Sequence, residues 1–206
     1  MLGIHARPVI NRLFRPLGTR LVAWGVTPNM ITVVGTVGVV GGALGFYPRG
    51  SFLWGTVVIT CFVFSDSLDG VVARISGSTG VYGAFLDSTL DRFGDAAIFG
   101  GIALYWAGPG DDQLVAGVAL FTLALSLITS YVKARAEGLG MTCNVGLVER
   151  PERLVAILVA TGFSGIFDVN ELQVAVLWVL AVTAAITVGQ RLAEVRRQAL
   201  ALSRPA

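Results

Sequence analysis

The sequence is dominated by long apolar runs, which restrict the fold more than any other feature. A run of about 20 mostly apolar residues can cross a bilayer as a helix, and lipid offers no hydrogen-bond partner to an irregular backbone. The hydrophobic share of 54% exceeds the roughly 45–50% of an average soluble domain. The sequence therefore predicts an all-α integral membrane protein with six transmembrane helices, at about residues 30–47, 51–75, 81–106, 113–136, 151–163 and 171–192.

The first 25 residues have a different pattern from the runs that follow. Arg7, Arg12, Arg15 and Arg20 are spread among apolar side chains, which is typical of an amphipathic helix lying at the membrane surface. We predict an N-terminal interfacial juxtamembrane helix in residues 1–25; a helical cap on the protein itself is the alternative. Residues 26–206 then form the six-helix transmembrane domain with a basic C-terminal tail.

The sidedness of the basic residues predicts the orientation. Six spans place both termini and the connections at 76–80 and 137–150 on one side of the membrane. The basic residues in or near these regions are Arg7, Arg12, Arg15, Arg20, Arg74, Lys133, Arg135, Arg150, Arg153, Arg191, Arg196, Arg197 and Arg204. The opposite side has Arg49 alone. The side that carries both termini is therefore predicted to be cytoplasmic, in the plasma membrane. Because the net charge is only +2 and no basic patch forms, a nucleic-acid partner is not expected.

Four aspartates lie around the 76–80 turn, in a chain with a charged fraction of only 14%. Asp66 and Asp69 are three residues apart, and Asp87 and Asp91 four apart, so each pair lies on one helix face. We expect all four carboxylates to meet in one pocket near the cytoplasmic surface. Hard divalent cations would neutralise them, and a pair about 4 Å apart would also hold a phosphate during phosphoryl transfer.

These acids allow two other interpretations. One is a buried ion-pair network with Arg74 and Arg92, which offers fewer cations than anions. The other is a cation or proton transporter, since acids within a membrane also mark ion pathways. The absence of an internal repeat and the position of the acids on one side argue against transport. Asp95, three residues after Arg92, is expected to form a structural ion pair with it, outside the site.

The spacing of these residues also resembles a known signature. The pattern D-x2-D-G-x2-A-R-x8-G-x3-D-x3-D is similar to that of the CDP-alcohol phosphotransferases, and the six-helix layout and the Thr27-Pro28-Asn29 start of the first span fit the same family. The pattern is filled without departure by Asp66, Asp69, Gly70, Ala73, Arg74, Gly83, Asp87 and Asp91.

The resemblance implies a catalytic role for each position. It implies that Asp66, Asp69, Asp87 and Asp91 hold two Mg²⁺ (or Mn²⁺) ions, and that Asp91 is also the general base. It further implies attack of an alcohol on CDP-diacylglycerol, with release of CMP, and a homodimeric enzyme. The residues expected around the CDP-diacylglycerol are Gly70, Arg74, Asn29, Thr32, Ser78 and Thr79.

The acceptor alcohol is predicted from three basic residues. Lys133, Arg153 and Arg191 lie at the cytoplasmic ends of spans four to six, where they can bind one phosphate in a common cavity; a pure orientation role is the alternative. The segments at 130–135 and 149–153 resemble those of actinobacterial family members that use inositol phosphate. We therefore predict inositol 1-phosphate as acceptor, phosphatidylinositol phosphate as product and a role in phospholipid biosynthesis, with glycerol 3-phosphate or free inositol as alternative acceptors.

Overall fold

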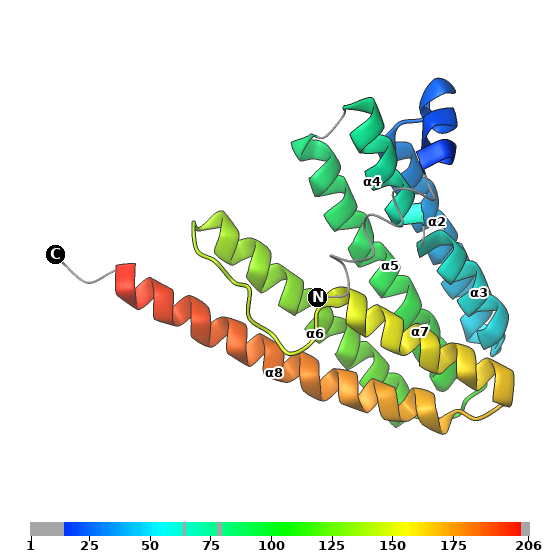
Figure 1. The fold of residues 1–206 in the computed structure, drawn as a ribbon. Helices are drawn as coiled ribbons and strands as arrows, with labels where there is room; N and C mark the ends of the chain where they lie inside the picture. The colour runs from blue at the N-terminus through cyan, green and yellow to red at the C-terminus, as the bar shows by residue number, and fades with distance from the viewer. Residues whose placement is uncertain (1–14, 64, 78–79, 203–206) are drawn as a thin grey trace.

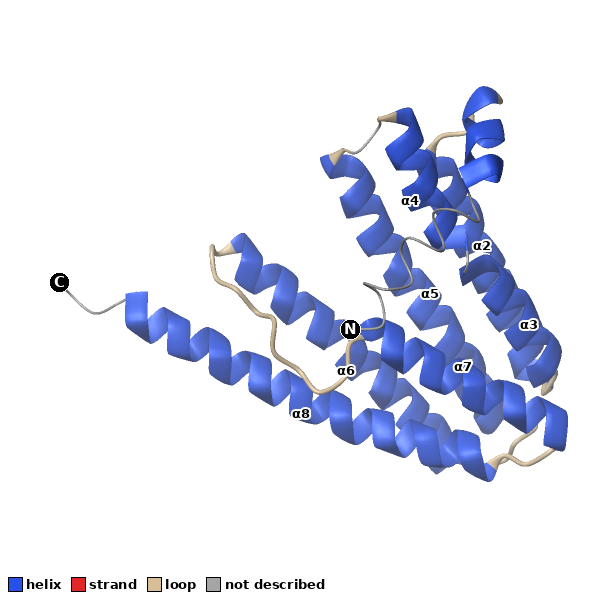
Figure 2. Cartoon of the chain, viewed as in Figure 1, coloured by secondary structure: helices blue, strands red, loops and turns tan. Residues whose placement is uncertain are grey.

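The chain folds as a set of packed helices (Figures 1 and 2). The computed structural model describes residues 15–63, 65–77 and 80–202, with the backbone alone at 65–67, and no strand occurs in these ranges. Residues 15–23 are helical. The remaining elements are α2 (Pro28–Phe46), the short 3-10 helix η1 (Tyr47–Arg49), α3 (Phe52–Val63), α4 (Ser65–Ser76), α5 (Val81–Ala107), α6 (Gln113–Gly138), α7 (Arg150–Phe167) and α8 (Glu171–Leu202).

Four segments of the described chain are long and apolar enough to cross a membrane. They are Pro28–Arg49, Phe52–Ser76, Gln113–Gly138 and Glu171–Leu202. α5 and α7 are not among them, because each carries charged residues in its first half: Asp87, Asp91, Arg92 and Asp95 in α5, and Arg150, Glu152 and Arg153 in α7. The protein is thus a multi-pass helical membrane protein, and the count of six spans stays a prediction.

The helix ends follow local sequence signals. Thr27 caps α2 through a hydrogen bond from the Met30 amide, directly before Pro28. Asp112 caps α6 by accepting from the amides of residues 114 and 115. Glu149 and Glu152 form a reciprocal capping box at the start of α7. Such caps satisfy amides that have no partner within the helix, so they set where each helix starts.

α3 and α4 together cover the predicted second span, and position 64 between them lies outside the described residues. One boundary differs strongly from the sequence-based expectation. The last helix continues ten residues beyond its predicted end at Leu192, to Leu202. The extension contains good helix formers such as Ala193 and Glu194, and Val195 packs against a small cluster formed by Ala136, Met141 and Cys143.

The predicted interfacial helix lies partly outside the described residues, since residues 1–14 are not described. Its described part, residues 15–23, contacts α4. Gly18 is buried, and a Cβ placed there would lie 3.0 Å from Val71 Cγ1 and 3.1 Å from Ile75 Cδ1. This contact joins the segment to the body of the protein, while its position at a membrane surface remains a prediction.

α5 lies at the centre of the packing, against α2 on one side and α6 on the other (Figure 1). α8 packs against α6 and α7, and α3 packs against α2 and α7. One buried apolar cluster connects these helices, with Ile59, Ile98, Ile102, Ile157 and Leu177 among its fully enclosed members. The core is formed toward the ends of the helices remote from the 76–80 turn, so charged residues near that turn are left around cavities.

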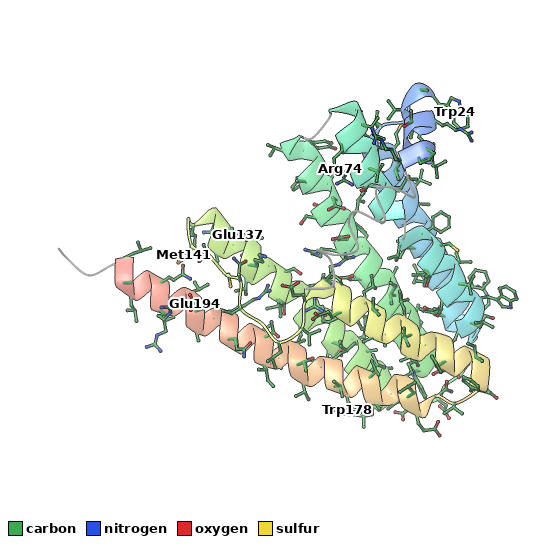
Figure 3. The ribbon with its side chains drawn as sticks, viewed as in Figure 1. Trp24, Arg74, Glu137, Met141, Trp178 and Glu194 are labelled. Carbon is green, nitrogen blue, oxygen red and sulfur yellow. The ribbon has the colours of Figure 1, made fainter. Side chains whose placement is uncertain are left out.

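The α6 and α8 ends diverge from α4 and the start of α5 (Figure 1). Figure 3 shows Glu137, Met141 and Glu194 together at these diverging ends, well apart from Arg74 on α4. The segment between α6 and α7 is fastened to α8 by Gln198, whose side-chain amide donates to Thr142 O at 2.7 Å and accepts from Thr142 N at 3.1 Å. This arrangement leaves a space that the charged side chains of α5, α6 and α8 can line.

The crossing of α3 and α7 depends on the absence of a side chain at Gly165. A Cβ at this position would lie 2.9 Å from Leu53 Cα, and backbone atoms cannot move aside as a flexible side chain can. Gly189 on α8 is a matched position, because nothing lies within 4 Å of a Cβ built there.

We predict that Gly165→Ala destabilises the protein by about 1–3 kcal/mol, because α7 must move away from α3. Gly189→Ala should leave stability unchanged or slightly raised, because Ala favours the helix. Thermal unfolding of both variants in one detergent measures the difference. Equal melting temperatures for the two variants would contradict the close crossing.

Candidate active site

Two of the predicted aspartates line an open groove at the ends of α2, α4 and α5. Asp69 and Asp87 face it, with Asn29 and Thr32 on the α2 side, and its volume is about 250 Å³. Small residues widen it, and a Cβ on Gly83 would lie only 3.3 Å from Asn29 Oδ1. The groove also includes Pro28, Gly70, Ala73, Gly80 and Ala84. Five of the predicted site residues therefore share this groove: Asn29, Thr32, Asp69, Gly70 and Asp87.

Thr32 fixes the orientation of Asp69. The Thr32 hydroxyl is buried and donates to Asp69 Oδ2 at 2.7 Å; it also lies 3.1 Å from the Pro28 carbonyl oxygen. Asp69 itself is half-buried, so the second carboxylate oxygen is left for a ligand in the groove. A hydrogen bond from a neighbouring helix to a candidate ligand is the kind of outer contact that orients metal-binding carboxylates.

Asp91 lies one turn further along α5 and lines a different, smaller cavity together with Arg150. Its Oδ1 atom is 2.8 Å from Arg150 Nη1, and its Oδ2 atom is 3.5 Å from Arg92 Nη1. Asp87 lies near enough to both Asp69 and Asp91 for its charge to act on each of them. The described residues thus bring Asp69 and Asp87 to one groove and hold Asp91 beside it in an ion pair.

The predicted Arg92–Asp95 ion pair is wrong. Asp95 is buried and pairs with Arg150, whose Nε lies 3.1 Å from Asp95 Oδ1 and 3.3 Å from Oδ2. Arg92 is directed instead toward Asp91 and a neighbouring cavity. Arg150 comes from α7, far along the chain, so a rule for residues three apart on one helix could not identify it.

A strongly basic cavity of about 340 Å³ lies beside Asp91 and Arg150. The three predicted acceptor-binding residues Lys133, Arg153 and Arg191 all line it. They come from α6, α7 and α8. Sequence reasoning missed two further basic residues of this cavity, Arg92 and Arg150; the only signal for them was their closeness in sequence to Asp91 and Arg153. The other lining residues are Ser88, Thr129, Ser130, Ala134, Glu137, Val148, Glu149 and Pro151.

The positive charge of this cavity exceeds the negative charge available around it. Within the described ranges, no carboxylate lies within 4 Å of Arg153 or Arg191. Arg153 is only 3% exposed. Arg191 donates to the carbonyl oxygens of Val145 at 3.0 Å and Thr129 at 2.6 Å. Because burying a cation without an anion is costly, the cavity is suited to an anionic ligand.

Glu137 and Glu149 do not offset this charge. Glu137 lies 3.9 Å from Lys133 and is more than half exposed, and Glu149 is engaged in the capping box of α7. Arg92 Nη1 is buried and makes no hydrogen bond among the described residues, although it lies 3.5 Å from Asp91 Oδ2 in an ion pair. Arg92 thus adds positive charge to the wall of the cavity.

Four of the predicted site residues lie outside the groove or outside the described residues. Arg74 is exposed on α4 (Figure 3) and lines a separate surface cavity with Arg15 and Thr19. Its Nη1 atom lies 3.6 Å from the position of a Cβ on Gly70, so the side chain runs along the rim of the groove. Ser78, Thr79 and the side chain of Asp66 lie outside the described residues.

The groove fits a hard divalent cation by the chemistry of its donors. Asp69 and Asp87 offer carboxylate oxygens, the ligands that Mg²⁺ and Mn²⁺ prefer. The described residues contain no group of three His, Cys, Asp or Glu side chains close enough to hold a metal. Because the side chain of Asp66 is not described, the full set of four aspartate ligands stays a prediction.

A helical membrane fold with an acidic groove beside a basic cavity is suited to binding divalent cations and anionic ligands. Comparison with known families identifies it more closely. The chain belongs to the CDP-alcohol phosphatidyltransferase family, whose model matches residues 25–189. This match confirms the resemblance drawn from the Asp66–Asp91 pattern, and the chain is accordingly a transferase.

The chain is similar to several curated relatives over nearly its whole length. It is 51% identical to the phosphatidylinositol phosphate synthase of Streptomyces avermitilis, over 96% of this chain and 84% of that protein. It is 43% identical to the Cutibacterium acnes phosphatidylinositol phosphate synthase, over 94% and 97% of the two chains.

Solved structures show the same fold. The crystal structure of Mycobacterium tuberculosis phosphatidylinositol phosphate synthase with CDP-DAG bound matches with a TM-score of 0.86 and 38% identity, covering 89% of this chain and 94% of that one. A structure of the same enzyme in complex with manganese and citrate matches with a TM-score of 0.85 and 38% identity, covering 88% of each chain.

We predict that Thr32→Val raises the Mn²⁺ concentration needed for half-maximal CMP release by about 10-fold, because Asp69 loses the donor that orients it. Thr36→Val is the matched control on the same helix, since the Thr36 hydroxyl donates only to the Thr32 carbonyl oxygen, at 2.9 Å. Activity titrated with Mn²⁺ measures both. An unchanged titration for Thr32→Val would show that this hydrogen bond does not support metal binding.

Proposed function

We propose that this protein transfers the phosphatidyl group of CDP-diacylglycerol to inositol 1-phosphate, producing phosphatidylinositol phosphate and CMP in phospholipid biosynthesis. The observation that carries the proposal is the buried Arg153, which has no carboxylate partner in the described chain and shares a cavity with Lys133 and Arg191. A phosphorylated acceptor supplies the missing anion. The names of the relatives in Streptomyces and Cutibacterium support the same acceptor.

The acidic groove is proposed to hold the reacting diphosphate. Asp66, Asp69, Asp87 and Asp91 would hold two divalent ions, Mg²⁺ or Mn²⁺. When bound, these ions neutralise phosphate charge and stabilise the charge that develops in phosphoryl transfer. The manganese complex of the Mycobacterium tuberculosis enzyme supports a metal of this type. The protein's own contribution is to orient Asp69 through Thr32 and to place Asp87 opposite it.

The nucleotide half of CDP-diacylglycerol is proposed to lie along the rim of the groove. Asn29, Thr32 and Gly70 line the groove, and Arg74 lies beside Gly70 at its edge. Gly70 has no side chain to block the approach of a cytidine or a phosphate. Ser78 and Thr79 complete the proposed set, and the acyl chains would extend sideways between helices into the lipid.

The basic cavity is proposed to bind and orient the acceptor. Lys133, Arg153 and Arg191 would hold its phosphate from three helices, and Arg92, which is ion-paired with Asp91, adds a fourth cation to the cavity wall. Asp91 lies between this cavity and the groove, because its partner Arg150 lines the cavity. In this position Asp91 can accept the proton of the attacking hydroxyl, while fixed substrates gain the rate advantage of proximity.

The number of spans and the orientation of the enzyme in the membrane are also proposals. Six spans, a cytoplasmic active site and cytoplasmic termini in the plasma membrane follow from the basic residues around the two cavities. The N-terminal helix would lie at the membrane surface, next to the groove through its contact with α4. A homodimer is proposed from the family resemblance.

The proposed reaction is tested by measuring CMP release from CDP-diacylglycerol by the purified protein. The acceptors to compare are inositol 1-phosphate, glycerol 3-phosphate, free inositol and serine, each with Mg²⁺, with Mn²⁺ and with excess EDTA. We expect release with inositol 1-phosphate and either metal, and none with EDTA or with free inositol, because the cavity needs a phosphate.

Two results would contradict the proposal in different ways. Faster release with free inositol than with inositol 1-phosphate would remove the role given to the basic cavity. Release that persists at the same rate in EDTA would remove the divalent ions from the acidic groove. Faster release with glycerol 3-phosphate would keep the phosphate site but replace the acceptor.

A further inference from the structure

Arg150 is the side chain that joins the acidic and basic halves of the site. It lines the basic cavity and also the smaller cavity that contains Asp91. Its position at the start of α7 is set by the capping box of Glu149 and Glu152 and by Pro151 at the first turn. The base of the side chain is therefore held firmly, and its guanidinium group reaches α5.

The contacts of Arg150 use all three nitrogens of the guanidinium group. Nη1 lies 2.8 Å from Asp91 Oδ1, and Nη2 lies 3.1 Å from both the Asp91 carbonyl oxygen and Asp95 Oδ1. Nε donates to Asp95 Oδ1 at 3.1 Å. Such a planar, multiply bonded group fixes direction as well as charge, which a lysine cannot do.

The ion pairs between α5 and α7 in the described chain all involve Arg150. The backbone of α7 packs chiefly against α3 and α8, whereas that of α5 packs against α2 and α6. Arg150 is therefore the polar link between Asp91 and the helix that carries Arg153. Asp95 is buried, and its carboxylate contacts Arg150 and no other cation within the described ranges.

We propose that Arg150 is a positioning residue that aims the Asp91 carboxylate at the acceptor cavity, and that Asp95 serves to hold Arg150 in that orientation. This inference rests on the proposed function, in which Asp91 receives the proton of the acceptor hydroxyl. Arg150 acts through Asp91, and Asp95 acts through Arg150. Loss of either contact leaves both substrates bound, but the Asp91 carboxylate is no longer directed at the hydroxyl that loses its proton.

The proposal is tested with Arg150→Met, Arg150→Lys, Asp95→Asn and the double variant Arg150→Met/Asp95→Asn. We expect kcat to fall about 100-fold in Arg150→Met and about 10-fold in Arg150→Lys and Asp95→Asn, because small displacements of a reacting group are costly. KM for both substrates should change by less than about 3-fold. The double variant should be no slower than Arg150→Met, since Asp95 has no other route to the site.

Arg196→Met is the matched control, because Arg196 is an exposed arginine on α8 outside both cavities. It should keep the wild-type kcat and KM. Rates are taken per folded protein, with folding followed by gel filtration and thermal unfolding in the same detergent. If Arg150→Met fails to fold, Asp95→Asn and Arg150→Lys decide the matter, because both keep the size and polarity of the native group more closely.

Three results would overturn the proposal. The first is an unchanged kcat in Asp95→Asn and Arg150→Lys, which would leave Arg150 a purely structural residue. The second is a fall in the kcat of the double variant equal to the product of the two single falls, which would give Asp95 a role of its own. The third is a rise in the acceptor KM alone, which would make Arg150 a direct acceptor ligand. Each assay uses whichever acceptor supports CMP release by the wild type, so failure of inositol 1-phosphate would be seen separately.

Discussion

The need to pair every charge buried among apolar helices governs this structure. Taking an ion out of water costs several kcal/mol unless a partner compensates for it. Asp91 and Asp95 find that partner in Arg150, and Asp69 accepts a hydrogen bond from Thr32. Arg153 finds no carboxylate within the described chain. The helices thus satisfy most of their buried charges internally and leave one group of cations for a ligand.

α5 is the element on which these requirements meet. Asp87 faces the groove shared with α2 and α4, while Arg92 and Ser88 face the basic cavity shared with α6, α7 and α8. Asp91 and Asp95 lie between, on the side that Arg150 reaches. Charges along α5 also explain why this helix is not among the four segments apolar enough to cross a membrane. The same residues that lower its hydropathy give one helix two differently charged faces.

Much of this arrangement could be predicted from the sequence, because helices in lipid follow the length of apolar runs and carry side chains at fixed spacing. All six predicted starts lie within two residues of the start of a helix, and the grouping of Asp69 with Asp87 follows from the same rules. Lys133, Arg153 and Arg191 were found for a related reason: each is the basic residue at the end of an apolar run, and three such ends enclose one space.

The errors have a common physical cause. The rule for residues three apart paired Arg92 with Asp95, but Arg150, distant in sequence, offers a bidentate contact that a local rule does not include. The contacts of Arg150 with Asp91 and Asp95 could not be predicted for the same reason, whereas its place among the basic residues that predict the orientation is unaffected. The length of α8 was underestimated because hydropathy ends at Leu192, whereas packing of Val195 and the Gln198–Thr142 contact extend the helix. Contacts between distant segments decide these features, and single-helix patterns do not contain them.

The phosphate of the acceptor completes the group of cations around Arg153. Equilibrium binding of inositol 1-phosphate and of free inositol should be measured for the wild type, Arg153→Gln and the exposed control Arg135→Gln. Inositol 1-phosphate should bind the wild type and Arg135→Gln equally, and Arg153→Gln about 10-fold or more weakly, since a charge-assisted hydrogen bond is lost. Free inositol should bind none of them measurably. Equal affinity of the three proteins for inositol 1-phosphate, or tighter binding of free inositol, would contradict it.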